Sequence, residues 1–416
     1  MPQLLADLTP LRISADFRRL WSALAVSNIG QQMTAVAVGI QVYAITGSVL
    51  AVGVLGFCQL VPLIVFGLYG GALSDTYDRR LVGLVTAAGL AACATVLMAQ
   101  SLLGWSSVAL LYAVVAAQSA LFAVGNPARS SITPRLIPMD LLPAANTLSM
   151  LSFSIGLTLG PLLGGLLIGA TGSVTVAYVA DLLAFSATLY AMVRMRPIPP
   201  SKDAPQKFGH QSVKDGLNYL KGKRNVQMSF YVDIVAMVFG MPRALFPAIA
   251  VVWFGDLSVT SAAVVGMLYA APAVGAIISS IFSGPLGHVR RQGLAVVVSV
   301  IGWGLAITAF GLTRSLGWGL LFLAAAGAAD NVSAIFRTTI LQAATPDAYR
   351  GRLQGIFTVV VAGGPRLGDV EAGLVAALAG LGFSVVSGGL VCIALTLVLA
   401  AGAPSFLRYD SRHPTP

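Results

Sequence analysis

Long uncharged runs dominate this chain and restrict what it can fold into. Val49–Tyr69 carries no charged residue, and neither does the longer stretch Leu81–Ala128. A helix needs about 20 apolar residues to cross a bilayer, and these runs supply one and two such lengths. Because no water reaches the bilayer core, every backbone group there must be paired within a helix or a closed barrel. The apolar residues are continuous rather than alternating, so the sequence predicts transmembrane helices.

The composition agrees with a polytopic membrane protein. Hydrophobic residues make up 57% of the 416 positions and charged residues 10%, whereas soluble domains have about 25% charged residues. The three cysteines, Cys58, Cys93 and Cys392, all lie in apolar runs, which predicts neither a disulfide framework nor a metal site. Asp7 and Asp16 precede the first apolar run without a small-residue cleavage site, so we expect no cleaved signal peptide.

The apolar runs predict an all-α membrane protein with twelve spans. We place them near 18–45, 50–71, 81–103, 106–128, 141–170, 173–194, 226–254, 261–284, 291–313, 316–345, 349–380 and 383–406. The longest hydrophilic segment lies between the sixth and seventh spans. This predicts an N-terminal six-helix half at 1–195, a linker at 196–224, a C-terminal six-helix half at 225–407 and a tail at 408–416.

Basic residues are distributed unevenly over the predicted loops. On this layout, 21 of the 25 Lys and Arg residues fall on the side of the two termini and the linker, and the opposite loops hold one, Arg314. By the positive-inside rule, we expect both termini and the linker to lie on the cytoplasmic side. The membrane that we expect is the plasma membrane. The formal net charge of +10 is thus explained by topology, and we expect no nucleic-acid partner.

The two halves also share an internal repeat. Val52–Leu55 recurs as Val265–Leu268, and Arg129–Ile132 corresponds to Arg337–Ile340 as Arg-Ser-Ser-Ile and Arg-Thr-Thr-Ile. The offset is 213 residues early and 208 late, which a short deletion in a loop explains. Parallel repeats of six helices are typical of one class of secondary transporters.

A short charged segment joins the second and third spans and reads Gly-x-Leu-Ser-Asp-x-x-x-Arg-Arg from Gly71 to Arg80. Its glycine allows helix ends to approach closely, while Asp75, Arg79 and Arg80 must be hydrated or paired because lipid excludes charges. The segment resembles the loop-2/3 signature of the major facilitator superfamily. Asp78 departs from it, since the family usually has glycine there.

A second motif lies in the fifth span and reads Gly-x-x-x-Gly-Pro-x-x-Gly-Gly, with Gly156, Gly160, Pro161, Gly164 and Gly165 at its fixed positions. Small residues permit close helix contact, and proline removes a backbone donor and bends the helix. The run resembles the antiporter motif of drug-exporting members of the superfamily. Ordinary helix packing is the alternative interpretation.

The resemblance extends over nearly the whole chain, from Phe17–Trp21 through Ala145-Asn146 and Pro242–Pro247 to Gly266–Pro272. It points to the drug:proton antiporter branch that contains the enterobactin exporter. This resemblance implies two pseudo-symmetric halves that rock about a central site, and export of catecholate siderophores or drugs driven by the proton gradient. We expect a monomer that binds a small molecule, protons and lipid, without cofactor or metal.

Acidic residues inside spans are candidates for proton coupling, since a carboxyl group in a partly dry cavity can bind and release a proton. Asp233 and Asp330 have no acidic counterpart in the first half of the repeat, so the fold does not demand them. A buried salt bridge with Arg243 or Arg337 is the alternative role. Asp181, in the sixth span, is a third candidate, although the resemblance implies that this span is peripheral.

Arginines and amides complete the candidate site. Arg129 and Arg337 occupy equivalent repeat positions, which favours a bracing role, Arg129 with Asp75, over direct contact with cargo. Arg366 and Asp369 lie three residues apart and can pair on one helix face; with Glu371 they suit a gate or fold support first and an anionic cargo second. Further candidates for a cargo cavity, or for contacts between helices, are Asn28, Gln31, Gln32, Gln118, Asn126 and Arg243.

No catalytic set is apparent, so we predict that the chain is not an enzyme. The histidines His210, His288 and His413 all lie in predicted loops or the tail, and the sequence has no phosphate-binding Gly-x-x-x-x-Gly-Lys-Ser/Thr loop. The sequence therefore predicts proton-coupled export of an amphipathic small molecule. Proton-symport uptake of a metabolite is the alternative, and a non-transporting scaffold is a third possibility.

Overall fold

The computed structural model describes residues 7–138, 141–198, 218, 220–255, 259–283, 286, 289–344 and 347–410. Most of the predicted linker and the last part of the predicted tail lie outside these ranges. Throughout the described residues the regular structure is helical. The chain packs as two compact units, Met1–Ile45 with Cys58–Gly209, and Thr46–Phe57 with His210–Pro416. We call them unit 1 and unit 2.

Twelve helical segments correspond to the twelve predicted spans, and the bounds agree within a few residues in most cases. In the first half they are α2 (Ala15–Thr46), α3 (Val49–Thr76), α4 (Arg79–Leu102), α5 (Val108–Leu136), α6 (Leu142–Thr171) and α7 (Thr175–Arg194). In the second half they are α9 (Arg224–Phe239) with η2 (Arg243–Leu245) and α10 (Phe246–Val252), then α11 (Ser261–Ile281), α12 (Gln292–Leu312), α13 (Leu316–Ala343), α14 (Asp347–Ala379) and α15 (Leu381–Gly402). Short helices α1 (Thr9–Ile13) and α16 (Pro404–Leu407) flank them.

Eleven of these segments are long and apolar enough to cross a membrane among the residues that the structure describes. The remaining one, α14, is also long, but three charged residues interrupt its apolar part: Arg366, Asp369 and Glu371. Charges within a span are costly in lipid and are kept at interior or hydrated positions. The fold class is therefore confirmed, and α14 stands out as the span with the most charge.

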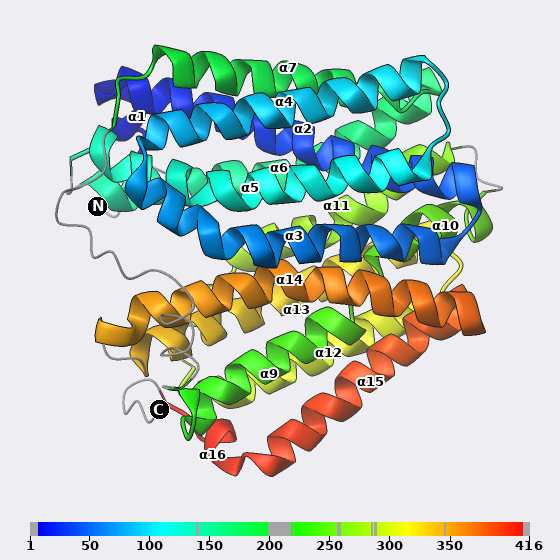
Figure 1. Ribbon diagram of the computed structural model, residues 1–416. Helices are drawn as coiled ribbons and strands as arrows, with labels where there is room; N and C mark the ends of the chain where they lie inside the picture. The colour runs from blue at the N-terminus through cyan, green and yellow to red at the C-terminus, as the bar shows by residue number, and fades with distance from the viewer. Residues whose placement is uncertain are drawn as a thin grey trace. The chain divides into compact units, whose positions relative to one another are not determined.

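The same packing pattern appears in each unit, as the repeat predicts. In unit 1, α4 packs against both α5 and α7, and in unit 2, α12 packs against both α13 and α15. Figure 1 shows α4 running alongside α5 and α7. These are the third, fourth and sixth spans of each half. The repeated arrangement confirms two pseudo-symmetric halves.

The seventh span is broken, which the sequence layout did not predict. α9 ends at Phe239, and the chain continues through Gly240, Met241 and Pro242 into the single 3-10 turn η2 before α10 begins. Proline lacks a backbone N–H and disfavours helix at the residue before it, which accounts for the interruption. Broken spans leave backbone groups and side chains free to line a site within the membrane.

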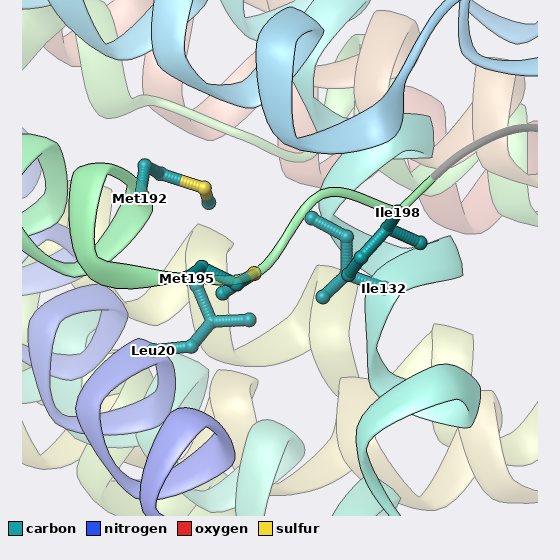
Figure 2. Close-up of a cluster of buried hydrophobic side chains, with 5 residues drawn as sticks. All are labelled: Leu20, Ile132, Met192, Met195 and Ile198. Atoms are coloured by element: carbon teal, nitrogen blue, oxygen red, sulfur yellow. The ribbon is translucent and has the colours of Figure 1, made fainter.

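The turn after α3 anchors the first residues of the predicted linker. The Asp78 carboxylate caps α4 by accepting a hydrogen bond from the Arg80 backbone N–H at 2.9 Å. It also accepts a hydrogen bond from the Ile198 backbone N–H at 3.1 Å. Arg80 donates to the carbonyl oxygens of Met192 and Val193 at the end of α7. Ile198 then packs in a buried cluster that Figure 2 shows, which contains Leu20, Ile132, Met192, Met195 and Ile198. The residue that departs from the family signature therefore attaches the linker to unit 1.

Replacing Asp78 with alanine is expected to lower stability, because the change removes a helix cap and the acceptor for Ile198. Loss of an N-cap costs about 0.5–2 kcal/mol. Thermal unfolding of the purified protein should show a lower midpoint, and trypsin should cleave faster after Arg194, at the end of α7. Asp7→Ala is the matched control, because Asp7 interacts with Thr9 ahead of the spans. Equal midpoints and equal cleavage rates for both variants would contradict this role.

Candidate functional site

Three charged side chains of unit 2 form a continuous group. Arg337 on α13 approaches the Asp233 carboxylate on α9 at 2.7 Å and the Asp330 carboxylate at 3.5 Å. The side chains of Asp233 and Arg337 are 1% and 3% exposed, whereas that of Asp330 is 39% exposed. Asp330 is therefore the exposed member of the group and lies next to the buried ion pair. The structure thus brings both predicted coupling acids onto the same arginine and realises the salt bridge with Arg337.

The third predicted acid, Asp181 on α7, lies in a different setting within unit 1. Its side chain is fully buried, and Oδ2 accepts a hydrogen bond from the Thr34 hydroxyl on α2 at 2.9 Å. Oδ1 has no hydrogen-bond partner among the described residues. Gly30 makes this close approach possible, since a methyl group there would lie 2.9 Å from Oδ1. Among the described residues, Asp181 therefore has no cationic partner, unlike Asp233.

The glycine motif of α6 packs directly on α2. A methyl group at Gly156 would lie 2.7 Å from the Asn28 Cβ atom, and one at Gly160 would lie 2.5 Å from the Gln32 Cβ atom and 2.8 Å from the Ile29 carbonyl oxygen. Gly164 lies against Met33 in the same way, and Pro161 and Gly165 are buried beside them. These residues therefore allow the polar face of the first span to touch the fifth.

Unit 2 repeats this arrangement between its fifth and first spans. Gly364 of α14 packs on the Met237 side chain of α9, and Gly368 packs on the Met237 carbonyl oxygen. Gly160 and Gly368 are equivalent positions of the sequence repeat. The close contact is therefore a property of both halves, and both helices also carry a Gly-Pro pair, Gly160-Pro161 in α6 and Gly364-Pro365 in α14.

The amides predicted for a cargo cavity differ in their contacts. Asn28 donates to the Ser152 hydroxyl at 3.4 Å, which is a helix–helix contact. Gln31, Gln32 and Gln118 are partly buried, and Asn126 is exposed. No hydrogen bond to these four side chains is found within the described part of the chain. They remain available for cargo or water.

The loop signature is only partly described. Gly71 and Asp75 lie in the last turns of α3, where side chains fall outside the description, so the predicted Arg129–Asp75 pairing stays a prediction. The Arg129 guanidinium lies 6.0 Å from the centre of the Phe122 ring. The Arg79 backbone N–H donates to the Ile198 carbonyl oxygen at 3.2 Å, and the Arg80 side chain holds the end of α7.

A second charged group of unit 2 surrounds the break in the seventh span. Arg243 begins η2, which packs on α14, the helix that carries Arg366 and Asp369. The Asp369 carboxylate lies near the Ala244 backbone N–H. Tyr269 of α11 donates its hydroxyl to the Arg243 carbonyl oxygen at 3.0 Å. The structure thus brings Arg243, Arg366 and Asp369 together, whereas no contact of the Glu371 side chain with them is found in the described part of the chain.

Sequence reasoning missed three contributors. Thr34 lies in the first span and was given no role, and Tyr269 lies in the Gly266–Pro272 stretch that carries the resemblance but was given no role of its own. The sequence marked Asp78 as a departure from the family signature, but it did not predict the hydrogen bond to Ile198 that explains this residue. A polar side chain at an otherwise apolar position of a span was the available signal for Tyr269 and Thr34.

Comparison with known proteins fits this architecture. Residues 5–411 match the family described as transmembrane secretion effectors. The chain is 30% identical over 404 residues to the enterobactin exporter EntS of Citrobacter koseri, covering 96% of this chain and 94% of the relative. It is 30% identical over 401 residues to the enterobactin exporter EntS of Escherichia coli O1:K1, covering 95% and 94%.

Solved structures share the fold at low sequence identity. The nucleoside transporter NupG superposes with a TM-score of 0.73 at 14% identity, over 95% of this chain and 100% of that chain. A peptide transporter POT in complex with sulfate gives 0.73 at 13% identity, over 96% of both chains. The relatives and the structural neighbours are transporters, not enzymes. The chain therefore belongs to the transmembrane secretion effector family of the major facilitator superfamily, and it is a multi-pass membrane transporter.

Proposed function

We propose that this transporter exports an amphipathic small molecule, a catecholate siderophore or a drug, across the plasma membrane in exchange for protons. Both termini and the linker lie on the cytoplasmic side in this proposal. The relatives named as enterobactin exporters support the cargo class and the direction. The observation that carries the coupling is Arg337 held between Asp233 and Asp330.

The geometry of this group suggests how a proton can act. Arg337 is attracted to both carboxylates, and protonation of either one removes its share of that attraction. The guanidinium then shifts toward the remaining carboxylate, and α9 and α13, which contribute the three side chains, rearrange. We propose that a proton taken from outside lowers the affinity for cargo in this way, and that its release inside restores it. The two units thereby expose cargo alternately to each side of the membrane.

Inverted membrane vesicles provide the test. An acidic lumen should drive uptake of a dye or a catecholate into vesicles that contain the wild type. We expect Asp233→Asn or Asp330→Asn to abolish this uptake while cargo still binds, because asparagine cannot exchange a proton. Asp7→Asn, ahead of the spans, is the control and should transport like the wild type.

The other outcomes are also informative. If both variants transport like the wild type, the coupling group is wrongly assigned, and Asp181, buried beside Thr34, becomes the acid to test. If a pH gradient drives uptake of neither cargo by the wild type, the export proposal is wrong.

A further inference from the structure

Two arginines of unit 2 lie inside spans without a direct partner. Arg243 occupies the break between α9 and α10, and Arg366 occupies the apolar part of α14; both are partly buried. Among the described residues, neither guanidinium donates a hydrogen bond or forms an ion pair. Arg337 and Arg314 differ, because the first has two carboxylates and the second has backbone carbonyls and an indole ring.

The two guanidinium groups belong to one cluster. Arg366 interacts electrostatically with Arg243, Asp369 and Tyr269. Asp369 lies near the backbone N–H of Ala244, and the Tyr269 hydroxyl is hydrogen-bonded to the carbonyl oxygen of Arg243. Because η2 packs on α14, the backbone of the broken span holds the cluster together.

The charges of the cluster do not balance. Among the described residues it contains two arginines and one carboxylate, Asp369, so one positive charge is in excess. Glu371 lies two residues beyond Asp369, a spacing that does not share a helix face, and it shows no interaction with either arginine. An uncompensated guanidinium within a span is costly and marks a functional position. An anion would supply both the missing charge and the missing hydrogen-bond acceptors.

We propose that Arg243 and Arg366, with Asp369 and Tyr269 as positioning residues, form a subsite for an anionic group of the cargo. The inference rests on the proposed export function and specifies the substrate class at the same site. A guanidinium presents a planar set of donors that matches a carboxylate or the adjacent oxygens of an ionised catechol. Asp369 limits the excess to one charge, which favours a singly charged group. An anionic lipid headgroup offers the same chemistry, so the test must separate the two sources.

The test compares two probes that differ in one charge, 2,3-dihydroxybenzoate and its neutral methyl ester. Binding to the purified full-length protein is measured by intrinsic fluorescence in a neutral detergent. We expect the wild type to bind the anion at least roughly tenfold more tightly than the ester, because hydrogen bonds to charged groups are the stronger ones. If the wild type binds both probes equally, the proposal is wrong, whatever the variants do.

Variants then assign the preference to the cluster. Arg366→Gln and Arg243→Gln should each weaken binding of the anion by about tenfold or more and leave the ester unchanged. Arg366→Lys should recover part of the affinity, because it restores the charge without the planar donors. Arg314→Gln is the matched control, an arginine of the same unit whose guanidinium is already occupied, and it should change neither probe. Equal losses for both probes in the glutamine variants would overturn the subsite.

Two further measurements distinguish the cargo subsite from lipid binding and from the export proposal. Repeating the titration with added phosphatidylglycerol should leave the anion's affinity unchanged; strong competition would assign the arginines to lipid and overturn the cargo subsite. In inverted vesicles, if Arg366→Gln transports the anion as well as the wild type, export stands and the subsite fails. If the wild type binds the anion selectively but no pH gradient moves either probe, the subsite stands and the export proposal fails.

Discussion

Replacing Arg337 with glutamine is expected to abolish transport and to destabilise unit 2. The side chain is 3% exposed and faces Asp233, which is 1% exposed, so its removal leaves a buried carboxylate without its cation. Breaking a buried ion pair from one side costs about 3–5 kcal/mol. Thermal unfolding in detergent should therefore show a clearly lower midpoint for Arg337→Gln than for the wild type.

The double variant Asp233→Asn with Arg337→Gln separates stability from coupling. It removes both buried charges and keeps hydrogen-bonding side chains of similar size, so it should recover most of the lost stability. It should not recover transport, because the exchangeable proton is gone. Arg314→Gln is the control for loss of an arginine outside this group. If Arg337→Gln is as stable as the wild type and transports normally, the ion pair has neither role.

Replacing Gly160 with alanine is expected to impair transport strongly, although the new residue adds one methyl group. Alanine in a helix interior is otherwise favoured over glycine by about 1 kcal/mol. Here the methyl group would lie 2.5 Å from the Gln32 Cβ atom and 2.8 Å from the Ile29 carbonyl oxygen, and backbone cannot move aside without shifting α2. Overpacking of this kind costs about 1–3 kcal/mol, so the unfavourable effect prevails.

A series of glycine variants tests this explanation. Gly67→Ala on α3 meets open space and should behave like the wild type, whereas Gly164→Ala meets the Met33 Cα atom at 3.1 Å and should be intermediate. The transport rate and the unfolding midpoint should both be highest for Gly67→Ala, lower for Gly164→Ala and lowest for Gly160→Ala. If the three variants are equally active, close α2–α6 packing is not required, and the motif needs another explanation.

The fold could be predicted almost completely from the sequence because hydrophobicity and charge report on the membrane directly. The uncharged runs predicted most helix positions within a few residues, and the internal repeat predicted the two halves. The break at Gly240–Pro242 was missed because the apolar stretches 234–239 and 244–252 read as one span despite Arg243 between them. Glycine followed two residues later by proline was the local signal for it.

The candidate site was predictable only in part. Comparison of the repeats singled out Asp233 and Asp330 as acids that only the second half carries. The sequence did not show which arginine Asp233 meets, since Arg243 and Arg337 were both available. The Asp78–Ile198 contact joins residues 120 positions apart, and the Asp181–Thr34 contact joins residues 147 positions apart. Such pairs follow from tertiary packing rather than from local pattern.

Proton antiport is the central claim, and the sign of a pH change tests it most directly. Proteoliposomes that contain the wild type, an internal pH dye and a load of 2,3-dihydroxybenzoate would be diluted into cargo-free buffer, with potassium and valinomycin clamping the voltage. Antiport predicts that the lumen becomes acidic as cargo leaves and protons enter, and that Asp233→Asn and protein-free liposomes lack this change. A lumen that becomes alkaline in a protein-dependent way would show that proton and cargo move together, and it would contradict the account.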